Sequence, residues 1–242
     1  MIYLVGEMSN GSAKLADTYP RGIGRCYVER PLEPFPGEPW ILDNGVFRAW
    51  NAAGRDPSID YADCYAAFEA RLENVAELVR EDRGPLFVVV PDRPADPSSF
   101  WTSLAWLDDY EQERQEELDP SGWYHGARMI PLFLAVQNGM TPELLEAERC
   151  AETDRPLLER VDGLFLGGTD EFKADTLDAW RELADRHGLR LHFGRCTQSR
   201  IAAALEAGCD SADSSHPNRL GGERWARFLE AFDAVQAARS VA

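Results

Sequence analysis

Short apolar runs alternate along the chain with longer segments of helical period, and this alternation restricts the fold more than any other feature. The runs are rich in Val, Ile, Leu and Phe, and each precedes a polar loop and a helical segment. Such alternation is typical of a parallel α/β sheet. Runs such as LFVVV and IPLFLAV show no polar alternation, which is typical of strands covered on both faces. The predicted strands are Ile2 to Val5, Arg25 to Val28, Trp40 to Asp43, Leu86 to Val90, Ile130 to Val136, Gly163 to Leu166, Leu189 to Phe193 and Asp210 to Ser214.

The number of strand–helix units sets the expected architecture. Eight units in 242 residues match the size of a (β/α)₈ barrel. We therefore predict an α/β fold of the TIM (β/α)₈ type, as a single domain over residues 1–242, with a doubly wound open sheet as the alternative. The acidic run Asp108 to Asp119 is predicted to form a long solvated helix, followed by the turn PSGWYHG. A C-terminal helix is predicted over about residues 221–240 from its apolar stripe, Trp225, Phe228, Leu229, Phe232 and Val235.

The charge balance bears on partners and location. The chain has 42 acidic and 25 basic side chains and a net charge of −17, so its overall field repels polyanions and anionic membranes. No apolar run reaches the roughly 20 residues of a membrane span, and the start of the sequence lacks the basic segment of a signal peptide. Five scattered cysteines without a CxxC pair fit a reducing compartment. We expect a cytoplasmic protein without a membrane partner.

Polar residues gather directly after the predicted strands. In a parallel α/β fold the carboxyl ends of the strands share one face, where active sites form. Each residue also has a plain structural interpretation: the carboxylates can cap helices, the glycines can serve turns, and the histidine can be a hydrogen-bonded core residue. Their convergence on one face favours a site, and the residues are Asp43, Asp92, Gln137, Gly167, Gly168, His192, Arg195 and Asp213.

The spacing of these residues excludes several familiar chemistries. The close His/Cys pairs, His192 with Cys196 and Cys209 with His216, match no established zinc spacing. The chain has no GxGxxG after its first strand, no Walker lysine and no Gly-x-Ser-x-Gly elbow. We expect neither a metal nor a cofactor, and a chemistry built on carboxylates.

Six of the strand-end segments resemble, in order, motifs of the tRNA-guanine transglycosylase superfamily, particularly its short phage and bacterial relatives that place 7-deazaguanine bases in DNA. LDNGVF resembles the D-S/N-G-G/A-F loop, VVVPD the strand that ends in a base-binding aspartate, and AVQNG the V-Q-G segment. FLGGTDEFK resembles the Gly-Gly turn with its T-E-W/F-K continuation, HFGRC resembles H-x-G-R, and GCDSADSSHPNR resembles the segment that carries the nucleophile. The resemblance covers about residues 40–220, and its phage members imply that the expected location is the host cytoplasm if a phage encodes the protein.

The resemblance implies a TIM-barrel pentosyltransferase that exchanges guanine for a modified base at an N-glycosidic bond. Asp213 would match the nucleophile that attacks C1′ of the sugar, and Asp43 would match the general acid/base at the purine. The remaining candidates are assigned to the substrate: Asp92, Gln137, Gly167 and Gly168 to the base edge, Phe47 to base stacking, His192 to the H-x-G-R segment, and Arg195 and Lys173 to a phosphate. A salt bridge for Arg195 and a solvated helix start for Lys173 are equally open.

Departures from the tRNA enzymes shape the expected partners. Nothing matches their Cys-rich zinc site, so no zinc subdomain is expected, and DNA, with or without a helper protein, replaces tRNA as the expected polymer. SSHPNR stands where the tRNA family has C-V-x-P-T-R, and Val46 replaces a glycine. Polymer binding should be salt-sensitive and confined to a patch including Arg195, Arg219 or Lys173.

Two other functions stay open beside base exchange in DNA. The first is base exchange or N-glycosidic hydrolysis on nucleosides or nucleotides, which suits the net charge of −17 better than DNA does. The second is a non-catalytic barrel that binds a deazapurine or a protein. The expected ligand in the enzymatic cases is guanine or a 7-deazaguanine base, and a homodimer is expected from the resemblance and from the prevalence of dimers.

Overall fold

The computed structural model describes residues 1–6, 22–28, 32–56, 58–117, 130–197, 200–214 and 222–239. Parallel strands pair in chain order, and the pairing of the last with the first closes a barrel. This closed barrel confirms the predicted TIM (β/α)₈ fold and excludes the doubly wound open sheet. The strands are β1 (Ile2–Gly6), β2 (Ile23–Tyr27), β3 (Trp40–Leu42), β4 (Phe87–Val89), β5 (Leu132–Val136), β6 (Gly163–Leu166), β7 (Arg190–Phe193) and β8 (Ser211–Ser214).

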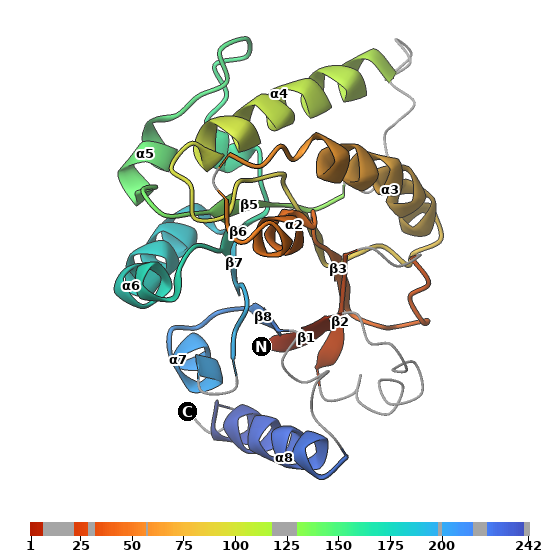
Figure 1. The fold of residues 1–242 in the computed structure, drawn as a ribbon, viewed down its shortest axis with the longest axis vertical. Helices are drawn as coiled ribbons and strands as arrows, with labels where there is room; N and C mark the ends of the chain where they lie inside the picture. Colours follow the sequence, from red (N-terminus) through yellow and green to blue (C-terminus); the bar gives the residue numbers. More distant parts are fainter. Residues whose placement is uncertain are drawn as a thin grey trace.

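Helices surround the barrel, and α2 lies over the middle of the ring of strands in the view of Figure 1. The acidic run falls in α4 as predicted, as far as Glu117, and α8 confirms the C-terminal helix. The turn PSGWYHG, His216 and Arg219 lie outside the described residues. The described helices are α2 (Val46–Ala52), α3 (Ala62–Arg80), α4 (Ser99–Glu117), α5 (Pro142–Ala147), the 3₁₀ helix η2 (Leu157–Glu159), α6 (Asp170–His187), α7 (Ile201–Glu206) and α8 (Gly222–Arg239).

Strand limits differ from the predicted ones by a few residues, and proline explains two of the differences. β5 begins at Leu132 rather than Ile130, because Pro131 has no N–H to donate to the neighbouring strand. β4 ends at Val89, two residues before Pro91. The apolar runs therefore predict all eight strands; they overestimate the length of β3, β4, β5, β7 and β8 and underestimate that of β1 and β2.

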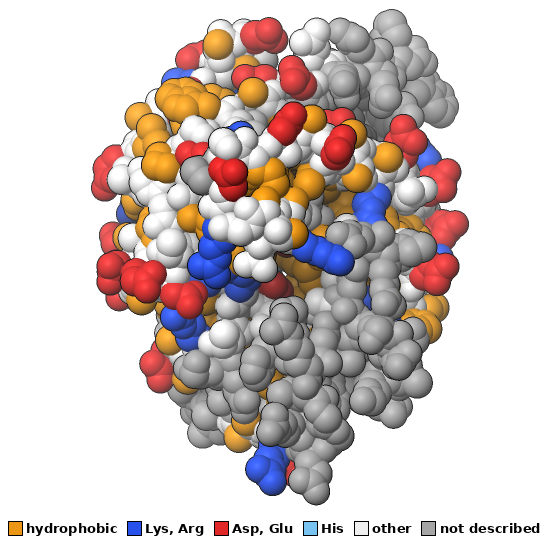
Figure 2. Space-filling model, in the orientation of Figure 1, with side chains coloured by type: hydrophobic (Ala, Val, Ile, Leu, Met, Phe, Trp, Pro, Cys, Tyr) orange, Lys and Arg blue, Asp and Glu red, His pale blue; other side chains and the backbone are white. Residues whose placement is uncertain are grey.

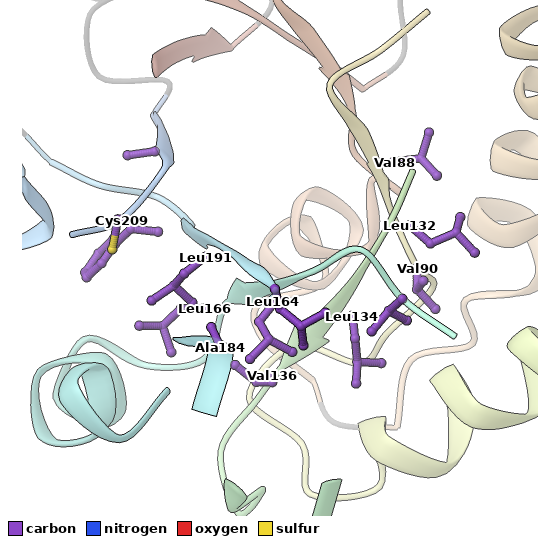
Figure 3. Close-up of a cluster of buried hydrophobic side chains, with 14 of the residues drawn as sticks. Val88, Val90, Leu132, Leu134, Val136, Leu164, Leu166, Ala184, Leu191 and Cys209 are labelled. Carbon is purple, nitrogen blue, oxygen red and sulfur yellow. The ribbon is translucent and has the colours of Figure 1, made fainter. Parts of the chain in front are cut away.

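Two apolar layers hold the barrel together. The strand faces that point outward pack against the helices, as Figure 3 shows for Leu164, Leu166 and Ala184 of α6. The opposite faces fill the barrel interior, where the rings of Phe87 and Phe133 stack with centroids 3.7 Å apart. Alternation along each strand decides which layer a residue joins. The interior cluster contains Leu4, Cys26, Ile41, Phe87, Val89, Phe133, Ala135 and Phe165.

Candidate active site

Strand alternation turns most of the predicted site residues toward the barrel interior, at the carboxyl ends of the strands. Ile41 belongs to the interior cluster, so Asp43, two residues further along the extended chain, faces the same way. Leu4 of β1 is also interior and pairs in register with Asp213 of β8. The same alternation turns Gln137 after β5, Gly167 after β6 and His192 within β7 toward the barrel interior. The residues brought together at this mouth are Asp43, Gln137, Gly167, His192 and Asp213.

Asp213 is held at the mouth by one of its two carboxylate oxygens. Its Oδ1 accepts hydrogen bonds from Nε2 of His192 at 2.9 Å and from the backbone N–H of Arg195 at 3.0 Å. Within the described part of the chain, no hydrogen bond to this side chain falls on Oδ2. The side chain keeps 12% of its surface exposed. Asp213 therefore combines an anchored oxygen with a second oxygen that can meet a substrate.

His192 does not lie where a substrate could touch it, and its predicted role in substrate binding is wrong. The side chain is fully buried between an aromatic stack on Phe165, at 4.8 Å, and an edge contact to Phe87, at 5.1 Å. Its Nδ1 lies 2.8 Å from Oγ of Ser211. Because a carboxylate only accepts, Nε2 carries the proton toward Asp213, and the Ser211 hydroxyl is the hydrogen-bond partner of Nδ1. His192 is the hydrogen-bonded core histidine of the alternative interpretation, and it orients Asp213.

The turn after β7 brings Arg195 to the mouth. Arg195 has a left-handed backbone, with φ of 52°, which aims its N–H at Asp213. Its guanidinium donates to the carbonyl oxygen of Gly168 at 2.8 Å and lies 4.0 Å from the centre of the Phe47 ring. The salt bridge considered for Arg195 is not found with any described carboxylate. Phe47, the predicted stacking wall, thus already stacks against an arginine.

Lys173 supports this turn through a hydrogen bond to its backbone. The prediction that Lys173 contacts a phosphate is wrong. The side chain is fully buried. Its Nζ donates to the carbonyl oxygen of Gly194 at 2.9 Å and lies 3.3 Å from Asp170. Burial, followed by the charge of Arg195, lowers the pKa of Lys173 to about 8. Lys173 is therefore neither a solvated helix start nor a group that a polymer could reach, and it fixes the residue before Arg195.

A second cluster joins Asp92, Asn44 and Gln137. Asp92 is 4% exposed and accepts from Nδ2 of Asn44 at 2.7 Å and from Nε2 of Gln137 at 2.5 Å. Both amides are fixed in orientation, because Oδ1 of Asn44 accepts from the N–H of Val46 and Oε1 of Gln137 accepts from the N–H of Ala95. Two donors therefore face Asp92. In this structure the predicted base-reading groups Asp92 and Gln137 bond to each other.

The glycines after β6 allow this cluster to form. A Cβ on Gly167 would lie 2.4 Å from Nε2 of Gln137, so a larger residue would displace the amide. Gly168 has φ of 77° and presents its carbonyl oxygen to Arg195. The two predicted glycines thus serve the site by close approach and by left-handed geometry.

Burial makes Asp92 sensitive to pH. Desolvation raises its pKa from 3.8 to about 6, against the lowering effect of the bonds from Asn44 and Gln137. Because the folded pKa lies above the unfolded value, this group stabilises the fold below about pH 4, and its contribution is lost as the pH rises through about 6. The full change corresponds to roughly 3 kcal/mol.

We expect this loss in urea unfolding of the wild type compared with Asp92→Asn, which cannot titrate at this position. Relative to that of Asp92→Asn, the free energy of unfolding of the wild type should fall as the pH rises from about 4 to about 6. Any constant cost of the new amide cancels in this comparison. A difference that does not change with pH, or that changes in the opposite direction, would contradict a raised pKa.

Asp43 has a structural role at the mouth beside its predicted catalytic one. Its Oδ1 accepts from the N–H of Gly45 at 2.7 Å, which forms a turn just before α2. Gly45, with φ of 80°, is the residue that caps this helix. Asp43 is half-buried. Asp43 is therefore not the capping residue considered for it from the sequence, since α2 receives no side-chain cap bond; its carboxylate instead holds the turn that leads into α2.

Sequence reasoning missed several residues of the site. Ser211 stands two positions before Asp213, so the period of a strand already places both on one face. Asn44 lies in the DNG segment beside Asp43, and nothing in the sequence distinguishes which of the two would meet Asp92. Among the described residues, no group of three or more His, Cys, Asp or Glu side chains is arranged to hold a metal ion. None of the described helices is long and apolar enough to cross a membrane.

Comparisons with known proteins identify no family for this chain. No protein-family model matches the chain, and no curated protein matches it. Among solved structures, one described as native KDPGal is 11% identical, with a TM-score of 0.44, over 100% of this chain and 96% of that chain. Tryptophan synthase from M. tuberculosis is 14% identical, with a TM-score of 0.43, over 97% of this chain and 88% of that chain.

A third solved structure is the HpcH/HpaI aldolase from Desulfitobacterium hafniense DCB-2. It is 11% identical, with a TM-score of 0.43, over 99% of this chain and 91% of that chain. These identities are too low to carry an activity to this chain.

Proposed function

We propose that this barrel is an enzyme that transfers a glycosyl group at the N-glycosidic bond of a guanine-type nucleotide unit, with Asp213 as the nucleophile. The observation that carries the proposal is the geometry of Asp213, whose Oδ1 is held by His192 and the Arg195 N–H while Oδ2 receives no bond from a described residue. A carboxylate fixed in this way at a barrel mouth suits attack on a sugar carbon.

The reaction divides between two carboxylates. Oδ2 of Asp213 attacks C1′, the C1′–N bond breaks, and the bonding electrons leave with the purine, to which Asp43 gives a proton. The incoming base then loses a proton to Asp43 and attacks C1′ with its ring nitrogen, and this step releases Asp213. The bonds from His192 and Arg195 stabilise the carboxylate each time it departs. No atom is consumed, and each base takes the place of the other.

The resemblance to transglycosylases supplies the finer part of the proposal, which is exchange of guanine for a 7-deazaguanine base in DNA. The cluster of Asp92, Asn44 and Gln137 would read the base edge after exchanging its internal bonds for bonds to the base. Amide and carboxylate groups suit the donors and acceptors of guanine. The half-buried ring of Phe47 would flank the base.

A second candidate is the same exchange on free nucleosides or nucleotides. Burial of Lys173 favours it, because one of the three cations predicted for a polymer patch cannot reach a phosphate. The net charge of −17 also favours a small substrate over DNA, because an acidic protein repels a polyanion.

Isotope exchange tests the proposed function and separates the two substrates. The protein is incubated with radiolabelled guanine and either guanine-containing DNA, single-stranded or duplex, or free deoxyguanosine. Incorporation of label into DNA supports polymer exchange, and incorporation into deoxyguanosine alone supports the small-molecule candidate. No incorporation into any of these acceptors, at low or high salt, would contradict glycosyl transfer.

A further inference from the structure

A row of alternating cationic and aromatic side chains runs outward from Asp213 along α2. The guanidinium of Arg195 lies 4.0 Å from the Phe47 ring centre, and the Phe47 ring lies 5.8 Å from that of Trp50. The guanidinium of Arg55 lies 5.5 Å from the Trp50 ring centre, at the far end. These four residues, Arg195, Phe47, Trp50 and Arg55, form the Arg–aromatic row. Both rings are half-buried and Arg55 is exposed, so the row lies at the surface.

The two arginines of this row differ from several others in the chain. Arg160 and Arg186, for example, pair with acids. Arg195 and Arg55 have no ion-pair partner among the described carboxylates. Burial lowers the pKa of Arg195, the charges of Asp170 and Asp213 raise it, and the charges of Arg55 and Arg200 lower it, so Arg195 has both acidic and basic groups around it. Figure 2 shows Lys and Arg side chains bordering a hollow on this face, with acidic and hydrophobic side chains inside it.

Backbone strain marks both ends of the row. Arg195 has φ of 52° and Arg55 has φ of 66°, and left-handed geometry is unfavourable for any residue with a Cβ. Glycine would adopt this geometry without strain, as Gly54 does beside Arg55 with φ of 69°. A sequence selected only for stability would favour glycine at an exposed position such as Arg55. Arg195, next to the candidate catalytic carboxylate, and Arg55, at the far end of the row, keep a charged side chain where glycine would be less strained, which points to a binding role.

We propose that the Arg–aromatic row binds an unpaired nucleic-acid strand, with Trp50 stacking on a base that flanks the reacting nucleotide and the arginines contacting its phosphates. Aromatic rings accept bases of any sequence, and alternating cations neutralise the backbone between them. A guanidinium stacked on a ring keeps its in-plane N–H groups for a phosphate. An enzyme that acts on a base must take it out of the duplex, so the flanking strand is unpaired there.

This inference rests on the proposed function for its biological meaning, but binding tests it separately. The probe is a short fluorescein-labelled single-stranded DNA oligonucleotide, with RNA and duplex DNA of the same sequence beside it. Fluorescence anisotropy is measured over a series of salt concentrations for the wild type, Trp50→Ala and Arg55→Gly. Arg149→Ala is the matched control, because it removes an exposed arginine that follows α5, at the opposite end of the barrel.

The row predicts a distinct pattern among these variants. Trp50→Ala should weaken binding of the single strand about tenfold, as expected for the loss of one stacked base. Arg55→Gly should make the dependence of log K on log salt shallower by about 0.7, the value for one phosphate contact to a single strand. The thermal unfolding midpoint of Arg55→Gly should not fall, because glycine relieves the strain. Arg149→Ala should bind like the wild type, and the comparison of DNA with RNA identifies the preferred sugar.

Equal binding by the wild type, Trp50→Ala and Arg55→Gly would overturn the inference, as would a duplex that binds as tightly as the single strand. The result also separates this inference from the proposed function. Base exchange into free deoxyguanosine, together with no oligonucleotide binding, would support the proposed function and contradict strand binding by the Arg–aromatic row. Oligonucleotide binding that depends on Trp50 and Arg55, without any base exchange, would support the row and contradict the function.

Discussion

Replacing Asp213 with asparagine should abolish base exchange and leave the fold intact. An amide is a poor nucleophile, and loss of a covalent nucleophile lowers the rate by a factor on the order of 10⁴ or more. The asparagine Oδ1 can still accept from His192 and from the Arg195 N–H, so the turn after β7 keeps both bonds. The measurement is isotope exchange beside thermal unfolding, with a large loss in the first and little change in the second.

Asp210→Asn provides the matched control, at the residue that precedes the strand of Asp213. Asp210 lies just before β8, where its Oδ2 accepts from the N–H of Leu191 at 2.8 Å and pairs with Arg181. This carboxylate is at the amino end of the strand, away from the mouth. Asp210→Asn should keep the exchange rate of the wild type. Equal losses in the two variants would show that the effect of Asp213→Asn is structural.

His192→Phe should lower kcat about a hundredfold and leave KM nearly unchanged. Phenylalanine fills the space between Phe165 and Phe87 but removes the donor to Asp213, and small errors in the position of a reacting group cost about this much. KM should hold because His192 is fully buried and touches no substrate.

His192→Gln is the conservative partner of this variant. Its Nε2 can donate to Oδ1 of Asp213, so most of kcat should return. Steady-state kinetics of the two variants distinguish positioning from packing. A rise in KM with unchanged kcat would instead mean that residue 192 contacts the substrate. Equal losses of kcat in both variants would show that the hydrogen bond to Asp213 does not contribute to catalysis.

The barrel and the position of its two carboxylates could be predicted from the sequence, because they depend on local pattern. Apolar runs of the right length identify the strands, and parallel strands bring their carboxyl ends to one face. The period of two then places Asp43 with Ile41 and Asp213 with Ser211. None of this needs knowledge of which side chains meet across the barrel.

The errors arose where packing between distant elements decides the outcome. Lys173 shares its helix face with Leu177, Trp180 and Ala184, and this spacing already points it toward the core. The position of Lys173 in the FLGGTDEFK segment does not by itself show this orientation toward the core. Contacts such as Arg195 on Phe47, or Asn44 with Asp92, join residues far apart in sequence, and no local pattern encodes them.

Mass spectrometry of the protein during turnover tests the central claim, covalent capture of the sugar by Asp213, most directly. The wild type is mixed with a guanine-containing substrate that it turns over, quenched in acid, digested and mapped. We predict a glycosyl adduct on the peptide that contains Asp213, which is absent in Asp213→Asn and disappears when excess incoming base is added. Base exchange without an adduct on this peptide, with full activity retained by Asp213→Asn, would contradict the mechanism.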